Sequence, residues 1–182
     1  MFSYLYKFMN KIIQEAQIGQ MEITFDLYSN QMKKYDLDSR EDLPAIMLDI
    51  KNTDFHFQTD RPQVVEAEFS LFFVTQLDGN PNSSAEAHLN MIDSICQEVT
   101  KINRMSADDL QAQYSFSALS GDANATSDCC IRQISYDGKI ETARTQDFAY
   151  DNLRINALAF KGIMNHYVSS VKNDISNSQI ND

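Results

Sequence analysis

The chain has 182 residues with 15 basic and 26 acidic side chains, so its formal net charge at pH 7 is -11. Hydrophobic residues make up 43% and charged residues 23%, a balance typical of a globular domain and not of a disordered or collagen-like chain. The acidity argues against non-specific attraction to nucleic acid or to an anionic membrane, because the lysines and arginines are scattered. Apolar runs such as Leu71–Val74 are far shorter than the roughly 20 residues that cross a bilayer.

The N-terminal segment predicts an amphipathic helix over residues 2–18. Apolar residues recur there every three or four positions, and Gly19, which suits a left-handed turn, follows them. Lys7 and Lys11 interrupt the apolar stretch, and no small-residue cleavage site follows. We therefore interpret this segment as part of the fold and not as a signal peptide.

Alternating patterns then predict a first group of strands. Residues 21–28 alternate like a strand and precede a polar loop. A compact apolar run covers residues 43–50, and residues 53–58 alternate again. The longest strand is expected at residues 63–77. One of its faces carries Val65, Ala67, Phe69, Leu71 and Phe73, and the other carries Glu66, Glu68, Ser70 and Phe72. This strand should therefore bury one face.

A turn cluster at residues 78–84 introduces a second predicted helix over residues 85–103. Ser83 and Glu86 have the spacing of a capping box, which marks a helix start. Its apolar stripe contains Leu89, Ile92, Ile95 or Cys96, Val99 and Ile102. The predicted core joins this helix to the longest strand and contains Leu89, Ile92, Val99, Phe69 and Phe73.

The next part of the chain predicts strands around an exposed loop. Residues 114–120 have a strand pattern, and residues 120–128 are small and polar, as in an exposed loop. Asp137 and Gly138 suit a type I′ turn, so residues 130–145 predict two strands joined as a hairpin.

Together these elements predict one α+β domain over residues 1–168, closed by a strand at residues 152–163. The sheet should be mixed and mostly antiparallel, with the helices 2–18 and 85–103 packed on one face, because each apolar helix stripe needs an apolar partner surface. Residues 169–182 are polar and predict a flexible C-terminal tail.

The stretch from Asp49 to Pro62 mixes aspartates with a histidine and two phenylalanines, which a metal site or an acid/base pair could use. Asp54 and His56 would project to the same side of a strand. A metal site needs a third and usually a fourth ligand, and neither His88 nor His166 stands in an HxH, HxxxH or HExxH arrangement. We therefore interpret Asp54 and His56 as solvent-facing strand residues with no metal-binding or catalytic role.

Other reactive residue types have structural interpretations. Ser117 and Ser120 lack a GxSxG elbow, and the five glycines form no phosphate-binding loop. Cys96 falls on the apolar helix stripe, which predicts a buried thiol. Cys129 and Cys130 are interpreted as a strand start with one thiol facing inward, and a reactive pair is the alternative. An odd cysteine count without CxxC suits a reducing compartment.

Further carboxylates and aromatic residues bear on binding. Most of the carboxylates expected in loops should be solvated, and a binding cleft lined by several of them is the alternative. These carboxylates are Asp108, Asp109, Asp122, Asp128, Asp137 and Asp147. The 11 phenylalanines and eight tyrosines exceed what one small core needs, which favours a protein partner.

The order of elements also carries a family resemblance. The residues concerned are Asn30-Gln31, Leu43-Pro44-Ala45-Ile46, the strand FSLFFV, the helix AEAHLNMIDSICQEV and the segment QDFAYDNLRINALAF. Over about residues 4–165 this order resembles the tail terminator, or tail completion, family of tailed bacteriophages and prophages. The resemblance brings no catalytic signature.

The resemblance implies a structural virion protein, not an enzyme, without cofactor or metal. Such proteins form a ring, usually a hexamer, that seats on the last ring of the tail tube, stops its polymerisation and offers a docking surface to the head. The implied partners are further copies of the chain, the tail tube protein and the head–tail connector protein, with no membrane involved. Assembly would take place in the host cytoplasm.

Within such a ring, DNA would pass through the lumen without specific binding, because acidic walls repel phosphate. Strand edges and the loop 120–128 are expected to reach the adjacent subunit. This loop and the polar C-terminal extension depart from the family pattern. Two alternatives stay open: a neck or head-completion protein of the same virion, and a small metal-dependent α+β enzyme or ligand-binding domain built around Asp54, His56 and a loop carboxylate.

Overall fold

The computed structural model describes residues 2–16, 18, 22–28, 43–56, 63–76, 81–118, 125–142 and 153–170. In chain order its elements are α1 (Phe2–Glu15), β1 (Thr24–Leu27), β2 (Ala45–His56), β3 (Gln63–Gln76), α3 (Pro81–Ile102), α4 (Ala107–Tyr114), β4 (Ser115–Ala118), β5 (Ala125–Thr142) and β6 (Leu153–Ser170). None of the described helices is long and apolar enough to cross a membrane.

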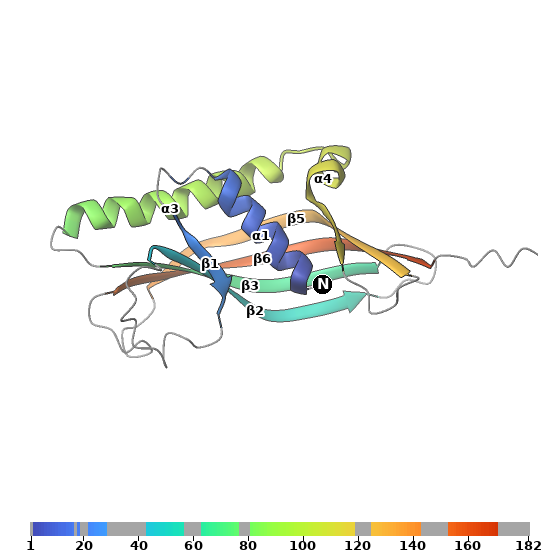
Figure 1. The fold of residues 1–182 in the computed structure, drawn as a ribbon, viewed down its shortest axis with the longest axis horizontal. Coiled ribbons are helices and arrows are strands. Elements are labelled where there is room, and N and C mark those ends of the chain that lie inside the picture. The colour runs from blue at the N-terminus through green and yellow to red at the C-terminus, as the bar shows by residue number, and fades with distance from the viewer. Residues whose placement is uncertain are drawn as a thin grey trace, which may run out of the picture.

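A six-stranded sheet in the order β1-β2-β3-β6-β5-β4 forms the centre of the fold. β1 runs parallel to β2, and the other neighbouring pairs are antiparallel. The helices α1, α3 and α4 all lie on one face of this sheet (Figure 1). The predicted fold class, a mixed and mostly antiparallel sheet with its helices on one face, is therefore confirmed.

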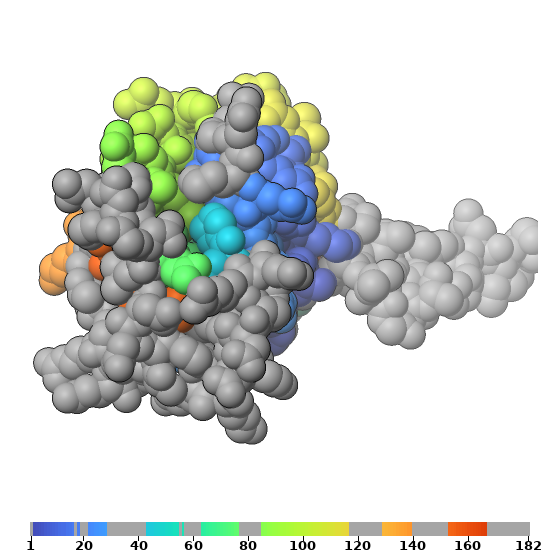
Figure 2. All heavy atoms as spheres, turned by 60° about the vertical axis from the view of Figure 1, so that its left-hand side comes forward, coloured from blue at the N-terminus to red at the C-terminus, as the bar shows by residue number. Residues whose placement is uncertain are grey.

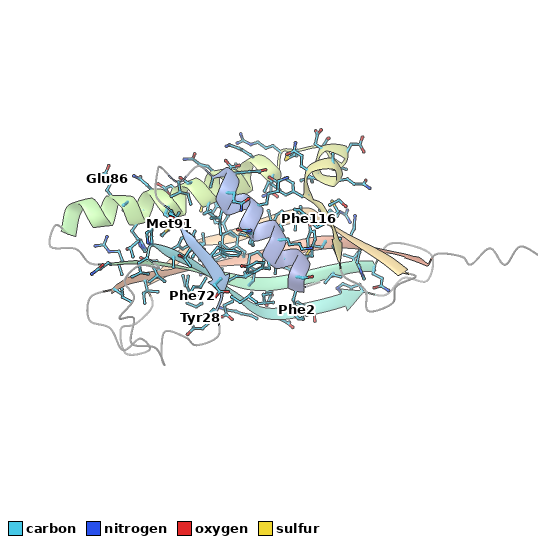
Figure 3. All side chains as sticks on the ribbon, in the orientation of Figure 1. Phe2, Tyr28, Phe72, Glu86, Met91 and Phe116 are labelled. Carbon is cyan, nitrogen blue, oxygen red and sulfur yellow. The ribbon has the colours of Figure 1, made fainter. Side chains whose placement is uncertain are left out.

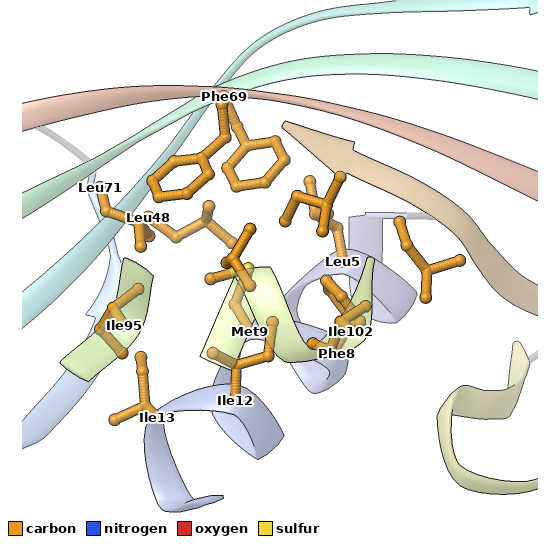
Figure 4. Close-up of a cluster of buried hydrophobic side chains, with 14 of the residues drawn as sticks. Leu5, Phe8, Met9, Ile12, Ile13, Leu48, Phe69, Leu71, Ile95 and Ile102 are labelled. Atoms are coloured by element: carbon orange, nitrogen blue, oxygen red, sulfur yellow. The ribbon is translucent and has the colours of Figure 1, made fainter. Parts of the chain in front are cut away.

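The main core lies between the helices and this face. From β3 it takes the five residues predicted to face inward, each no more than 1% exposed: Val65, Ala67, Phe69, Leu71 and Phe73. α1 contributes Leu5, Phe8, Met9, Ile12 and Ile13, which pack toward α3 and the sheet (Figure 4). In the space-filling view α1 lies against α3 (Figure 2). One apolar stripe per helix thus covers one apolar sheet face, as the periodicity requires.

A smaller apolar cluster lies on the opposite face of the sheet. It contains Ala45, Met47, Val74, Leu153 and Ile155. The rings of Tyr28 and Phe72 pack against it with their centroids 4.8 Å apart (Figure 3). This cluster makes one end of β2, β3 and β6 apolar on both faces, so the predicted one-sided burial of the longest strand applies to its other end.

The helix α3 differs from its prediction at its start and in its buried face. It begins at Pro81, so Ser83 lies inside the first turn and not at the predicted N-cap position. Leu89 is 53% exposed, whereas His88 and Met91 are fully buried, so the predicted place of Leu89 in the core is wrong. Met91 points toward the sheet and Glu86 away from it (Figure 3). Ile92, Val99, Phe69 and Phe73 are buried together, as predicted.

The helix α4 was not predicted, and a hydrogen-bonded cap explains its position. Ser106 Oγ accepts a hydrogen bond from the Asp109 amide at 3.2 Å and donates one to Asp109 Oδ2 at 2.6 Å. Ser106 is thus the N-cap of α4, and its spacing to Asp109 is that of a capping box, although Asp109 bonds the Ser106 hydroxyl and not the Ser106 amide. Asp108 and Asp109 therefore belong to the first turn of a helix, where negative charge is favourable, and not to a loop.

Tyr4 ties α1 to α4 and β5. Its hydroxyl donates a hydrogen bond to the carbonyl oxygen of Tyr114 at 2.9 Å and accepts one from the amide of Ile131 at 2.5 Å. The Tyr4 side chain is 1% exposed. Burial is the main cause that raises its pKa, so the hydroxyl stays protonated and can make both bonds.

β5 replaces the predicted hairpin. Residues 125–142 form one long strand that pairs with β6, and Asp137 and Gly138 lie within it, where the register shifts between Tyr136 and Ile140. Gly138 has φ of 72°, and Asp137 Oδ1 accepts a hydrogen bond from the Lys139 amide at 3.0 Å. The pair thus builds a bulge in one strand instead of a turn between two.

Gly138→Ala should lower the free energy of unfolding by about 1 kcal/mol, because a side chain disfavours positive φ. No atom lies within 4 Å of the added Cβ, so steric clash adds nothing. Gly162→Ala is the matched control. Its Cβ would make ordinary contacts with Ile131 and Phe69 at 3.5 and 3.6 Å, so its stability should change by less than about 0.5 kcal/mol. Equal losses in the two variants, measured by urea denaturation, would contradict this assignment.

Other predicted boundaries also shift. β2 is one strand with an irregularity between Ile50 and Asn52, not two separate stretches. Residues 125–128, predicted as part of an exposed loop, belong to β5, and residues 119–124 lie outside the described residues. β6 extends to Ser170, two residues into the predicted tail.

Candidate functional site

The helix-free face of the sheet gathers charged side chains from four strands. Along β2 and β3, Asp54 and Glu66 are register partners, and Glu68 follows two positions after Glu66. Lys161 on β6 pairs in register with Glu68, and Ser135 on β5 pairs with Lys161. We call this surface the acidic face and define it by Asp54, His56, Glu66, Glu68, Asp137, Lys51 and Lys161. Its four carboxylates outnumber its two ammonium groups.

An ion pair crosses the middle of the acidic face. Lys161 Nζ lies 2.7 Å from Glu66 Oε2, and His56 Nε2 lies 3.9 Å from Glu66 Oε1. The hydrogen bond from Lys161 is the largest cause that lowers the pKa of Glu66, and the same bond raises the pKa of Lys161. Both groups are therefore charged at neutral pH, and they fix the side chains of β3 and β6 relative to each other.

A shallow groove of about 350 Å³ lies beside this ion pair. Its polar lining comes from β2, β3, β5 and β6 and consists of Lys51, Glu68, Ser135, Asp137 and Lys161. Its lining contains both lysines and carboxylates, so it can accept charged or polar groups of a partner surface.

Asp54 and His56 lie on one face of β2, as predicted, and both are exposed. The carboxylate that approaches His56 is Glu66 on the neighbouring strand, not Asp54. Among the described residues, no group of three or more histidines, cysteines, aspartates and glutamates could hold a metal ion.

An Asp54→Ala/His56→Ala double variant should therefore have the same metal content as the unaltered protein, measured by elemental analysis. Stoichiometric zinc or manganese in the unaltered protein, lost from the double variant, would contradict this prediction and favour the metal-dependent alternative.

His88 forms a buried polar cluster that the sequence did not reveal. Its Nδ1 lies 2.9 Å from Thr75 Oγ1, and its Nε2 lies 2.8 Å from Asn156 Oδ1. The amide oxygen of Asn156 can only accept, so Nε2 carries the proton and Nδ1 accepts from the Thr75 hydroxyl. This arrangement satisfies both ring nitrogens of a neutral imidazole and ties α3 to β3 and β6.

Stability should decrease as the pH falls below about 6.5, the ordinary pKa of histidine. Burial is the largest cause that lowers the pKa of His88, and the charge of Arg154 lowers it further. Between the lowered and the ordinary pKa, the unfolded chain binds more protons than the folded one, so stability rises with pH there. His88→Gln should flatten this pH dependence in urea denaturation. Equal slopes for the variant and the unaltered protein would contradict it.

The three cysteines are free thiols, and two of them are buried. Cys129 and Cys130 are both buried, whereas the prediction placed one thiol of the pair inward. The Cys130 thiol donates a hydrogen bond to the Ile131 carbonyl at 3.4 Å. Cys96 is only half-buried, against the prediction of a buried thiol. Burial is the largest cause that raises the pKa of Cys96 and of Cys130, and a protonated thiol is a poor nucleophile.

The remaining residues considered as candidates are dispersed. Ser117 pairs in register with Asp128 between β4 and β5, so Asp128 is a strand residue and not a loop residue. Asp137 lies at the β5 bulge and on the groove. Ser120, Asp122 and Asp147 lie outside the described residues.

Neither a model of a known protein family nor any curated protein matches this chain.

Proposed function

We propose that the protein is a tail terminator, a structural virion protein that forms a ring on the tail tube of a bacteriophage or prophage and joins the tail to the head. The observation that carries this proposal is the acidic face, because it gathers exposed carboxylates on the side of the sheet that carries no described helix. The ring and its partners, the tail tube protein and the head–tail connector protein, are what the family resemblance of the sequence implies.

The charge of the acidic face suits a wall along which DNA must slide. Glu66 and Lys161, whose charged atoms are 2.7 Å apart, offset each other's charge, which leaves the carboxylates of Asp54, Glu68 and Asp137 against the ammonium group of Lys51. A phosphate backbone is repelled by such a surface, so DNA passes without sticking. With this face toward the lumen, α1, α3 and α4 form the outer layer of the ring.

The helical layer also offers groups for contact with the tube or the head. Phe2 at the start of α1 is 57% exposed, and Leu89 on α3 is 53% exposed. Isolated exposed apolar residues are common on protein surfaces, so these two are minor support.

Arrest of tube growth tests this function. Tail tube protein of the same phage or prophage is polymerised with and without the chain, and tube lengths are measured by electron microscopy. Tubes should stop lengthening once the chain is added. Tubes of equal length under both conditions would refute the proposal.

A further inference from the structure

Short strands cover only part of the two margins of the sheet. β1 forms one margin and pairs with Ala45–Leu48 of β2, and β4 forms the other and pairs with Ser127–Cys130 of β5. Within the described part of the chain, the rest of the outer edges of β2 and β5 have no strand neighbour. A strand edge presents unpaired amides and carbonyls to which another chain can add a strand.

Side chains bond the backbone groups on the outer edge of β1. The Thr24 amide donates to the carbonyl of the residue before β2 at 3.0 Å, so by alternation Phe25 and Leu27 direct their backbone groups away from the sheet. The Phe25 carbonyl accepts a hydrogen bond from the Tyr6 hydroxyl at 3.3 Å, and the Leu27 amide donates one to Asp26 Oδ1 at 2.7 Å. Both outward positions therefore have a side-chain partner.

Tyr4 and Asn103 do the same on the outer edge of β5. Ile131 directly follows the stretch that β4 covers, and its amide donates to the Tyr4 hydroxyl at 2.5 Å. At Ile134, Asn103 Nδ2 donates to the carbonyl at 2.5 Å, and Asn103 Oδ1 accepts from the amide at 3.2 Å. The side-chain amide of asparagine has the donor and the acceptor of a peptide group, so Asn103 bonds Ile134 as a neighbouring strand would.

Neighbouring residues bond two further amides on the uncovered stretches of β2 and β5. The Thr53 amide donates to Asn52 Oδ1 at 2.9 Å, and the Lys139 amide donates to Asp137 Oδ1 at 3.0 Å. Each of these bonds lies at the irregularity of its strand. Bulges are themselves one of the means by which proteins protect exposed strand edges.

The helical layer supplies the long-range members of this set. Tyr4 and Tyr6 are two positions apart on α1, so their side chains point to opposite sides of the helix, and they reach the β5 and β1 margins. The backbone amide of Asn103 donates to the Val99 carbonyl at 3.1 Å, so the last turn of α3 holds Asn103 in place. The helices that cover one face of the sheet thus also contact both of its margins.

We infer that these side chains are edge caps, a device that keeps both margins of the sheet closed to strand addition by a second copy of the chain. A second copy would have to displace a cap before its own strand could bond at that position, and at Ile134 it would have to break two hydrogen bonds. Contacts between copies at the capped positions are then made by side chains and not by strand pairing. The inference does not depend on the proposed tail function.

Amide hydrogen exchange tests the Asn103 cap. In Asn103→Ala the Ile134 amide should exchange at least about tenfold faster than in the unaltered protein, because it loses its acceptor. The amides of Thr53, which has a separate cap, and of Phe69 in the core of β3 should exchange at unchanged rates. An unchanged rate at Ile134, or a rise at Phe69 as large as that at Ile134, would contradict the assignment.

Removal of one cap at each margin tests the device. Asn52→Ala/Asn103→Ala releases the amides of Thr53 and Ile134, so its average mass in light scattering should be at least about twofold that of the unaltered protein at equal concentration. Asn90→Ala is the matched control, because it removes the same side chain from an exposed position on α3. Equal masses for the double variant and the unaltered protein, or an equal rise in the control, would overturn the inference.

Discussion

Ile92→Ala should lower the free energy of unfolding by about 2 to 5 kcal/mol, the range for truncating a large buried side chain. Ile92 is 1% exposed and belongs to the core between α3 and the sheet. The truncation removes apolar contacts and leaves a cavity. The neighbouring side chains are packed between the helices and the sheet, so they cannot move to fill it. Urea denaturation of the purified protein measures the change.

Leu89→Ala is the matched control, because it removes apolar atoms from the same helix one turn away. Leu89 is 53% exposed, so its truncation should cost less than about 0.5 kcal/mol. A loss of more than about 2 kcal/mol for Leu89→Ala, or a negligible loss for Ile92→Ala, would show that α3 presents a different face to the sheet.

Tyr4→Phe should cost about 1 to 3 kcal/mol, although it removes a single oxygen. The hydroxyl accepts from the Ile131 amide and donates to the Tyr114 carbonyl, and the residue is 1% exposed. Phenylalanine keeps the ring in place but leaves a buried amide without its acceptor. The measurement is again the free energy of unfolding from urea denaturation.

Tyr6→Phe is the matched control, because it removes a hydroxyl from the same helix at a position that is only partly buried. Its hydroxyl donates to the Phe25 carbonyl at 3.3 Å and is only partly buried. The expected loss is about 0.5 kcal/mol or less. Equal losses in the two variants would mean that the Tyr4 bridge contributes nothing particular to the junction of α1, α4 and β5.

Strong periodic patterns made the fold class predictable. β3 alternates over its central residues, and α1 repeats its apolar residues at helical spacing, so their buried faces could be assigned from the sequence. Leu89 shows the limit of this approach. It falls within the apolar stripe of α3, but His88 is buried in its place because Thr75 and Asn156 satisfy both ring nitrogens. Those partners lie 13 and 68 residues away in the sequence.

In β5, pairing with the distant strand β6 decided the structure, and the local turn signal did not. Asp137 and Gly138 suit a tight turn, yet β6 offers a partner along most of β5, and the pair is accommodated as a bulge. A capping signal for α4 was present at Ser106 and Asp109, four residues beyond the end of α3, but it has aspartate where glutamate is usual.

The acidic face was predictable only in part. Alternation along β3 placed Glu66 and Glu68 on its outer side. Lys161 and Asp137 join them through the registers of β6 and β5, which depend on pairing between distant segments. Tyr4, Phe8, Phe69, Phe73 and Tyr114 are buried in the core, so these rings are not available to a protein partner.

Imaging of tube ends tests the terminator function most directly. The protein is mixed at moderate salt with assembled tail tubes of the same phage or prophage, and the ends are averaged by electron cryomicroscopy. Salt screens the repulsion between subunits of net charge -11. We expect a ring of density, six-fold like the family rings, on one end of each tube, with the sheets inside and the helices outside. Bare ends on tubes that continue to lengthen would contradict the proposal.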